Sequence, residues 1–349
     1  MTPFEEDMME ISRVLDDLKI RNANILITGA TGLIGSVLVK ALLNYNKHYS
    51  GGNQILALIR NEEKARNVFG RFYDDEHLLC LKGDVLQPVK CSQRIDYIIH
   101  AASETASVRM VNYPVETLWT AIAGSRNLLE LAREKQVKGM VYLSSMEVFG
   151  VTESSLEQVS EENLGYIDIQ KVRSCYPESK RMVENMCACY AQEYGVPVRI
   201  ARLAQTFGAG VSKSETRVFA QFARSVVNKE DIVLHTSGGS YGNYVYTSDA
   251  AAAIFTLLIK GNNGEAYTVC NEATNMRIRD MAEMAAKDLA EGQIRVVYDI
   301  PESDMKYGYA PEVHMKLDAS KMRSLGWIPR IGLREAYERL IAGWKESAT

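Results

Sequence analysis

The sequence predicts an α/β fold, in which a doubly wound parallel sheet is followed by a smaller C-terminal lobe. Two observations carry this prediction. Between residues 23 and 208, short runs of branched and aliphatic residues alternate with segments of helical periodicity, which is typical of a parallel sheet covered by helices on both faces. A glycine-rich turn also joins the first apolar run to the helix that follows it.

The expected strands are short and nearly all apolar, and they cover 24–28, 54–59, 77–83, 94–100, 139–145 and 197–203. The helical segments between them cover 33–45, 61–69, 114–136 and 176–194. The first 22 residues predict a leading helix packed against the main body. Its apolar side chains at helical spacing are Met8, Ile11, Val14, Leu15 and Leu18.

Beyond residue 208 the alternation becomes less regular. Helical patterns and short strands follow one another at 215–229, 232–236, 243–247, 249–260, 266–270 and 278–290. The chain closes with a turn and an amphipathic helix. This part is expected to form the smaller lobe.

Composition excludes several classes of partner. The net charge of -4 offers no basic surface for nucleic acid, and no apolar run approaches the ~20 residues of a membrane helix. The six cysteines show neither a disulfide-scaffold spacing nor a zinc-site spacing. We therefore expect no metal, no nucleic acid and no membrane partner, and reduced thiols in a cytoplasmic protein.

Gly29, Gly32 and Gly35 lie directly after the first strand, at the start of a helix. Glycine permits a tight turn and lets the backbone approach a pyrophosphate, and the helix N-terminus offers N–H groups to that charge. This order predicts a Rossmann-type dinucleotide site; a glycine-rich turn without a ligand is the alternative. The other loop residues expected to contact the cofactor are Thr31, Leu33 and Ile34.

The second strand ends in Arg60, where an acidic residue often holds the ribose hydroxyls of NAD. An arginine can receive the 2′-phosphate of NADP, so NAD is expected while Arg60 leaves NADP open; a solvated charge is the plainer alternative. Asp84 and Val85 follow the third strand. Asp84 is expected to contact the adenine amino group, unless it is only a turn residue.

Tyr176 and Lys180 are four positions apart on an expected helix and so share a face. Because an ammonium stabilises a phenolate, the pair can move a proton on a substrate hydroxyl near neutral pH. Ser145, at the end of the fifth strand, would hydrogen-bond the same oxygen. If that strand end stays extended, Glu147 points to the same side as Ser145; a carboxylate that caps a local turn is the alternative.

With these motifs the chain resembles the extended short-chain dehydrogenase/reductase superfamily, in the branch of NAD-dependent nucleotide-sugar epimerases and dehydratases. The resemblance covers nearly the whole chain after the leading helix and rests on "TGATGLIG", "GDV", "IIHAASETAS", "LSSMEVFG", "YPESK", "ARLAQTFGAG" and "LGWIP". The stretch from "YPESKRMVENM" to "RIARLAQTFG" is most similar to the nucleotide-sugar decarboxylases and their neighbours. It implies that Ala101, Ala102 and Ser103 line the nicotinamide side of the cofactor.

The resemblance also implies a reaction. Tyr176 would take the proton of a sugar hydroxyl while the adjacent hydride goes to the nicotinamide, and Lys180 would hold the cofactor ribose and lower the tyrosine pKa. The resulting keto-sugar is then re-reduced on the other face, loses water, or loses carbon dioxide. A homodimer formed through the helices 114–136 and 176–194 is a further family expectation.

The chain departs from the family pattern beside Ser145. Dehydratases of this branch carry Asp-Glu there, the aspartate serving as acid for the departing hydroxyl, whereas this chain has Met146 and Glu147. A thioether donates no proton, so dehydration is disfavoured. Other family positions differ as well, with Ala121, Gln205 and Gly242 replacing two asparagines and a phosphate-gripping arginine; the cations that could replace that arginine are Arg217, His314 and Lys316.

We interpret the chain as an N-terminal helix (1–22), a dinucleotide-binding domain with the catalytic residues (23–208) and a mainly substrate-binding lobe (209–349). The expected function is conversion of a nucleotide sugar through a keto-sugar, by epimerisation or decarboxylation. An NADPH-dependent keto-sugar reductase and a non-catalytic dinucleotide sensor are the alternatives. The side chains expected to contact the sugar substrate are Glu104, Ser145, Glu147, Gln205 and Arg217.

Overall fold

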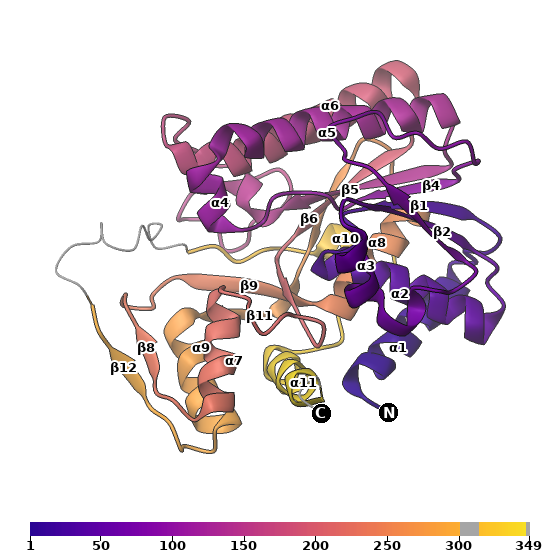
Figure 1. The fold of residues 1–349 in the computed structure, drawn as a ribbon. Coiled ribbons are helices and arrows are strands. Elements are labelled where there is room, and N and C mark those ends of the chain that lie inside the picture. Colours follow the sequence, from indigo (N-terminus) through magenta and orange to yellow (C-terminus); the bar gives the residue numbers. More distant parts are fainter. Residues whose placement is uncertain (301–313, 347–349) are drawn as a thin grey trace.

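A seven-stranded parallel sheet forms the centre of the molecule (Figure 1). The computed structural model describes residues 1–300 and 314–346. The strand order is β10-β6-β5-β4-β1-β2-β3, so the chain winds outward from β1 in one direction and from β4 in the other. The reversal lies between β1 and β4, and doubly wound sheets bind ligands beside such a reversal, at the carboxyl ends of the strands. The predicted fold class is confirmed.

The strands of the central sheet are β1 (Asn24–Thr28), β2 (Gln54–Ile59), β3 (Leu78–Lys82), β4 (Tyr97–His100), β5 (Gly139–Ser145), β6 (Val198–Leu203) and β10 (Ala266–Val269). The strands outside it are β7 (Gln205–Phe207), β8 (Ile232–Leu234), β9 (Tyr241–Tyr246), β11 (Asn271–Arg277) and β12 (Val296–Tyr298). The α-helices are α1 (Pro3–Asp17), α2 (Leu33–Tyr49), α3 (Glu62–Phe69), α4 (Ser107–Asn112), α5 (Pro114–Lys135), α6 (Cys175–Tyr194), α7 (Val218–Asn228), α8 (Thr247–Lys260), α9 (Ile278–Met284), α10 (Ser320–Arg323) and α11 (Leu333–Glu346).

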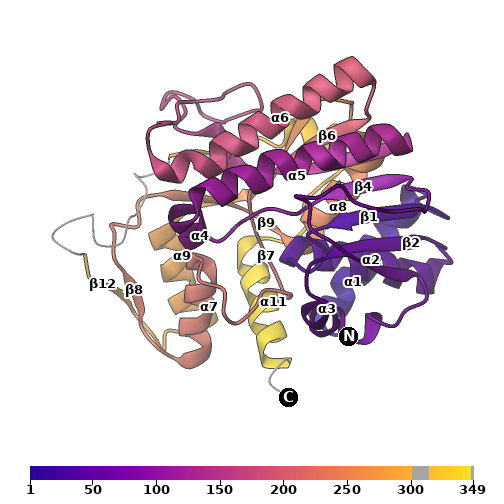
Figure 2. The same cartoon turned by 45° about the horizontal axis from the view of Figure 1, so that its top comes forward.

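Helices cover both faces of the sheet (Figure 2). Helices α5 and α6 run side by side over one face, and α1, α2 and α8 lie on the other. Alternate residues of β1 supply the two cores, because successive side chains of a strand point to opposite faces. Leu26 packs in the core beneath α5 and α6, whereas Ile25 and Ile27 pack in the core shared with α1, α2 and α8.

The predicted leading helix is present as α1. The Thr2 hydroxyl accepts a hydrogen bond from the Glu5 amide, and the Glu5 carboxylate accepts one from the Thr2 amide, a capping box that fixes the helix start. The buried face of α1 packs on α2, α8 and α11. Asp7 on this face accepts a 2.6 Å hydrogen bond from the Tyr246 hydroxyl and a 3.1 Å hydrogen bond from Arg339, so the helix is tied to β9 and α11.

The chain beyond residue 208 contributes to both parts of the molecule. Strand β10 completes the central sheet by pairing in parallel with β6, and the alanine-rich helix α8 is buried against that sheet. The helices α7, α9 and α11 and the β12-β8 pair build the smaller lobe, together with a β11-β9-β7 sheet whose strand β7 comes just before residue 208. Its core holds Phe207 between Phe219 and Tyr337, with ring centroids 4.6 Å and 5.2 Å apart.

Across residues 1–300 and 314–346, none of the helices has the length and apolarity that crossing a membrane requires.

Candidate active site

The candidate site lies at the carboxyl end of β5. There the strand leads into a short 3₁₀ turn, Met146–Phe149, and the first turn of α6 packs beside it. The sheet itself positions the site, because β5 is a central strand hydrogen-bonded to β4 and β6. Side chains that extend from its end are therefore held by a rigid support.

The two adjacent serines at this strand end have different environments. Ser144 is buried and donates a 2.5 Å hydrogen bond to Glu184, which in turn pairs with Arg202 at 2.8 Å. Ser145 faces the other way, where it accepts a 3.2 Å hydrogen bond from the Glu147 amide and lowers the pKa of Tyr176. Ser144 therefore belongs to a buried structural network, and Ser145 is the serine that reaches the site.

Tyr176 is buried in the first turn of α6. Burial raises the pKa of Tyr176 to about 12, the Glu147 charge acts in the same direction, and the hydrogen bond with Ser145 opposes them. Burial of the phenolate costs free energy because the protein interior solvates the charge poorly. The phenol thus needs further positive charge before it can act as a base near neutral pH.

Lys180 lies under Tyr176, with its ammonium nitrogen 5.7 Å from the centre of the phenol ring. Its hydrogen bond goes to the Leu143 carbonyl at 2.7 Å, and burial lowers the pKa of Lys180 to about 8. Burial dominates the pKa of Tyr176, so the expectation that Lys180 lowers this pKa stays a prediction.

Glu147 does not continue the strand. Since β5 ends at Ser145, the expected extended alternation is wrong, and Glu147 extends from the 3₁₀ turn instead. Its carboxylate pairs at 3.0 Å with Arg173, which the sequence analysis did not single out. In the sequence, the feature that could have pointed to Arg173 is its position three residues before Tyr176, in "RSCY".

The glycine loop fits a dinucleotide. Gly29 has a φ of +64°, and a Cβ atom there would lie 2.6 Å from the Ala101 carbonyl, so a larger residue would be strained and would clash. A Cβ atom on Gly35 would lie 2.2 Å from the Gly29 oxygen, so the helix can approach the strand only with glycine there. Gly32 is the N-cap of α2 and makes no side-chain cap, which leaves the helix N-terminus available for phosphate.

A buried hydrogen-bonded chain fixes the loop after β4, and it was also missed from sequence. Thr28 and the His100 Nδ1 lie 2.7 Å apart, and the His100 Nε2 lies 3.1 Å from Ser125. Thr28 also accepts a 3.2 Å hydrogen bond from the Ala102 amide. Burial lowers the pKa of His100 to about 3, so this imidazole is neutral and serves to hold the 101–102 backbone against Gly29.

Arg60 and Asp84 meet at the ends of β2 and β3. Their side chains lie 3.9 Å apart, and the Arg60 side chain is 81% exposed. Asp84 also accepts a 2.9 Å hydrogen bond from the Leu86 amide, as a turn residue does. Val85 beside it is buried and its carbonyl accepts a hydrogen bond from Asn127.

Among the expected substrate residues, Arg217 acts on the tyrosine. Arg217 pairs at 2.7 Å with Glu215, and its charge lowers the pKa of Tyr176. The Glu104 carboxylate instead forms an ion pair with Arg109 at 2.6 Å. The Glu104 carbonyl also accepts a hydrogen bond from the Ser103 hydroxyl. Gln205 begins β7 and pairs with Tyr244 of β9.

The other family departures have local structural explanations. A Cβ atom on Gly242 would lie 2.5 Å from the Tyr244 ring, so the position of the family arginine is filled by an aromatic side chain. Ala121 is buried on α5. Two other cations were candidates for the role of that arginine. The ring centroids of His314 and Tyr241 lie 6.1 Å apart. The Lys316 carbonyl accepts a hydrogen bond from the Val159 amide.

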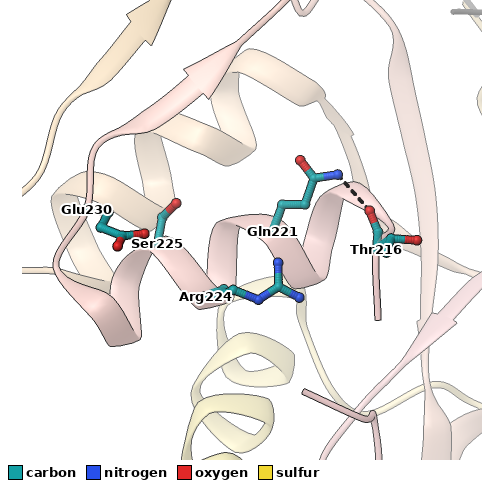
Figure 3. Close-up of a pocket in the computed structure, with 5 residues that line it drawn as sticks. All are labelled: Thr216, Gln221, Arg224, Ser225 and Glu230. Carbon is teal, nitrogen blue, oxygen red and sulfur yellow. Dashed lines mark hydrogen bonds between the residues drawn. The ribbon is translucent and has the colours of Figure 1, made fainter. Parts of the chain in front are cut away.

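A pocket of about 300 Å³ opens at α7 and the residues that flank it (Figure 3). Its lining side chains are Thr216, Gln221, Arg224, Ser225 and Glu230. Gln221 donates a 2.6 Å hydrogen bond to the Thr216 carbonyl across it. None of the catalytic candidates lines this pocket, although Thr216 is the neighbour of Arg217 in the chain.

A family model and curated relatives both match most of this chain. The model of the NAD dependent epimerase/dehydratase family matches residues 25–271. UDP-glucuronic acid decarboxylase 1 of Arabidopsis thaliana is 25% identical over 328 residues, 93% of this chain and 70% of that protein. UDP-glucuronic acid decarboxylase 6 of the same plant is 27% identical over 318 residues, 90% of this chain and 86% of that protein.

Solved structures share the fold. UDP-glucose 4-epimerase of Thermotoga maritima superposes with a TM-score of 0.78 at 21% identity, over 93% of this chain and all (100%) of that chain. UDP-glucuronic acid 4-epimerase of Bacillus cereus, in complex with UDP-glucuronic acid and NAD, superposes with a TM-score of 0.75 at 19% identity, over 93% of this chain and 99% of that chain.

Proposed function

Because this chain belongs to the NAD dependent epimerase/dehydratase family, we propose that it converts a nucleotide-activated sugar through a keto-sugar, with a UDP-linked uronic acid as the preferred substrate. One observation carries the proposal: Ser145, Tyr176 and Lys180 meet at the end of β5, at the same edge of the parallel sheet as the glycine loop after β1. That arrangement supports proton removal from a sugar hydroxyl.

Each residue has a distinct task in this proposal. Tyr176 accepts the hydroxyl proton, and Ser145 hydrogen-bonds the same oxygen and holds it at the phenol. Lys180 supplies the buried positive charge that the phenolate requires. Gly29, Gly32 and the N-terminus of α2 hold the pyrophosphate of NAD, which when bound supplies the hydride acceptor for the sugar carbon.

The fate of the keto-sugar follows from the side chains beside Ser145. Met146 supplies no proton for a departing hydroxyl, so we favour decarboxylation or epimerisation. A keto group placed beta to a carboxylate accepts the electron pair left when carbon dioxide departs. The similarity to UDP-glucuronic acid decarboxylases supports decarboxylation as the first reaction to test.

A second candidate, an NADPH-dependent keto-sugar reductase, is favoured by Arg60, since an exposed guanidinium at the end of β2 can pair with a 2′-phosphate. The two candidates differ in cofactor balance. Purified protein that keeps NAD through gel filtration supports the redox-neutral cycle, whereas stoichiometric loss of NADPH supports the reductase.

The direct test is mass spectrometry of the products formed from UDP-glucuronic acid, UDP-glucose, dTDP-glucose and GDP-mannose. We expect loss of carbon dioxide from UDP-glucuronic acid, or an unchanged mass with a new retention time if the reaction is epimerisation. Loss of water from any of them would contradict the inference drawn from Met146. The matched control is Tyr176→Phe, which should form product far more slowly.

We also propose a homodimer that forms through α5 and α6, in a cytoplasmic location that agrees with the six free cysteines. Large apolar side chains on these helices are exposed, as expected for a surface that a partner covers; they are Val115, Trp119, Met182 and Tyr194. Light scattering should report twice the chain mass, and Trp119→Glu should reduce it to one chain mass.

A further inference from the structure

The pair formed by Arg173 and Glu147 spans the candidate active site. We propose that Arg173 is a positioning residue, whose guanidinium fixes the Glu147 carboxylate and screens its charge from the Tyr176 phenol. This inference rests on the proposed function, because it concerns the proton transfer assigned to Tyr176.

The geometry joins the two elements that carry the catalytic side chains. Arg173 lies in a 3₁₀ turn, Val172–Ser174, directly before α6, and donates a 3.0 Å hydrogen bond to Glu147 in the turn after β5. Its guanidinium carbon also lies 5.6 Å from the centre of the Tyr176 ring, which is within cation–π distance. One cation thus contacts both the carboxylate and the base.

Both ends of the pair are anchored by backbone contacts. The Glu147 amide is held by Ser145, and Ser174, next to Arg173, donates a 2.6 Å hydrogen bond to the Asp168 carbonyl. The ion pair therefore fixes the spacing between the end of β5 and the start of α6. Ser145 and Tyr176 extend from these two ends.

The charges act on the phenol in opposite directions. Glu147 raises the pKa of Tyr176, and Arg173 lowers it. Arg217 also lowers that pKa, but Glu215 occupies its guanidinium at 2.7 Å. Lys180 also lies over the phenol ring, at 5.7 Å, but its hydrogen bond goes to the Leu143 carbonyl. Arg173, by contrast, both binds Glu147 and contacts the ring.

The pair is half-exposed, with 37% of the Arg173 side chain and 41% of the Glu147 side chain accessible. Pairs of this kind add little to folding stability, because water screens them. A purely structural role would therefore leave the pH dependence of catalysis unchanged. If Arg173 screens the Glu147 charge from the phenol, loss of Arg173 would shift the pH dependence of catalysis.

The test is the pH dependence of kcat/KM for UDP-glucuronic acid, whose acid limb reports ionisation of Tyr176. Arg173→Gln should move this limb upward by about one pH unit, Arg173→Lys should keep it near the wild-type position, and Glu147→Gln should move it downward. The matched control is Arg334→Gln, which breaks another 3.0 Å pair, with Glu338 on α11, and should not move the limb.

An Arg173→Gln limb at the wild-type position, with the protein folded and loaded with NAD, would overturn the inference. If Arg173→Gln does not fold, the downward shift in Glu147→Gln decides the question instead. If the wild type turns over no nucleotide sugar, the proposed function fails. The inference is then decided by spectrophotometric titration of Tyr176. The Tyr176 signal is the titration curve of the wild type minus that of Tyr176→Phe. In Arg173→Gln the midpoint of this signal must lie at higher pH than in the wild type.

Discussion

Lys180 faces Tyr176 across one turn of α6, with its ammonium 5.7 Å from the phenol ring centre and its hydrogen bond given to the Leu143 carbonyl. The two side chains are therefore neighbours without a direct hydrogen bond. The pKa of Lys180, lowered to about 8 by burial, keeps most of this lysine charged at pH 7, so the positive charge that a phenolate needs is already in place beneath the ring.

Removing either member of this pair should stop catalysis in different ways. We expect Tyr176→Phe to lower kcat by roughly 10²–10⁴-fold while NAD stays bound, because the proton acceptor is lost. Lys180→Met should lower kcat and also weaken NAD retention, because it removes a charge expected at the cofactor ribose. Steady-state rates and cofactor content after gel filtration check both statements; an unchanged kcat in Tyr176→Phe would remove tyrosine from the mechanism.

Gly29→Ala should abolish NAD retention. Alanine at a φ of +64° is strained, and its Cβ atom would lie 2.6 Å from the Ala101 carbonyl, so we expect a stability loss of about 2–5 kcal/mol. Calorimetry with and without NAD measures both effects. The control is Gly332→Ala, where a Cβ atom meets nothing within 4 Å; equal losses in the two variants would contradict the close-approach argument.

The ratio of NAD to NADP affinity should depend on Arg60 and Asp84. With the Asp84 carboxylate 3.9 Å from the guanidinium, a 2′-phosphate would meet a negative charge beside its cation, so the wild type should prefer NAD. Asp84→Asn should shift the ratio of NAD to NADP affinity toward NADP by about tenfold. Arg60→Ala should shift this ratio toward NAD. Isothermal titration with both cofactors tests this, and a ratio that neither substitution changes would make Arg60 a solvated charge.

Stability should fall as the pH rises from about 4 to about 7, because of Asp7. Burial raises its pKa from 3.8 to about 7, so the folded state favours the protonated form. That stabilising contribution is complete below pH 4 and is lost as the pH passes 7. The loss amounts to about 4 kcal/mol by the linkage of pKa to stability.

Denaturant titrations across that pH range measure the effect, and Asp7→Asn, which mimics the protonated side chain, should flatten the curve. Part of the slope should remain in this variant, since burial also raises the pKa of Asp249 to about 6. A slope in Asp7→Asn equal to that of the wild type would show that α1 does not carry this dependence.

The main sheet was predictable from sequence because its strands are continuous apolar runs. Six strands were predicted, with bounds that differ from the observed ones by three residues at most, as at the start of β4, Tyr97. The glycine turn was predictable for a similar reason, since Gly29 and Gly35 follow a backbone requirement that is local to the chain.

Contacts between distant segments could not be predicted in this way. The Thr28–His100–Ser125 chain joins side chains from β1, β4 and α5, and nothing in the local pattern of any one element indicates the others. Arg173 was missed because its partner Glu147 was expected on an extended strand, whereas the 3₁₀ turn redirects that carboxylate toward α6.

Strand β10 has a consequence for how the protein is made. Every proposed catalytic side chain is part of the growing chain once residue 180 has been synthesised. The β6 edge nevertheless stays unpaired until β10 has been made, and the sheet face under α8 stays uncovered until α8 has been made. Unpaired edge strands are templates for pairing with other chains. A nascent chain that carries all of its catalytic residues is therefore not yet an enzyme, and during that interval its open edge needs protection.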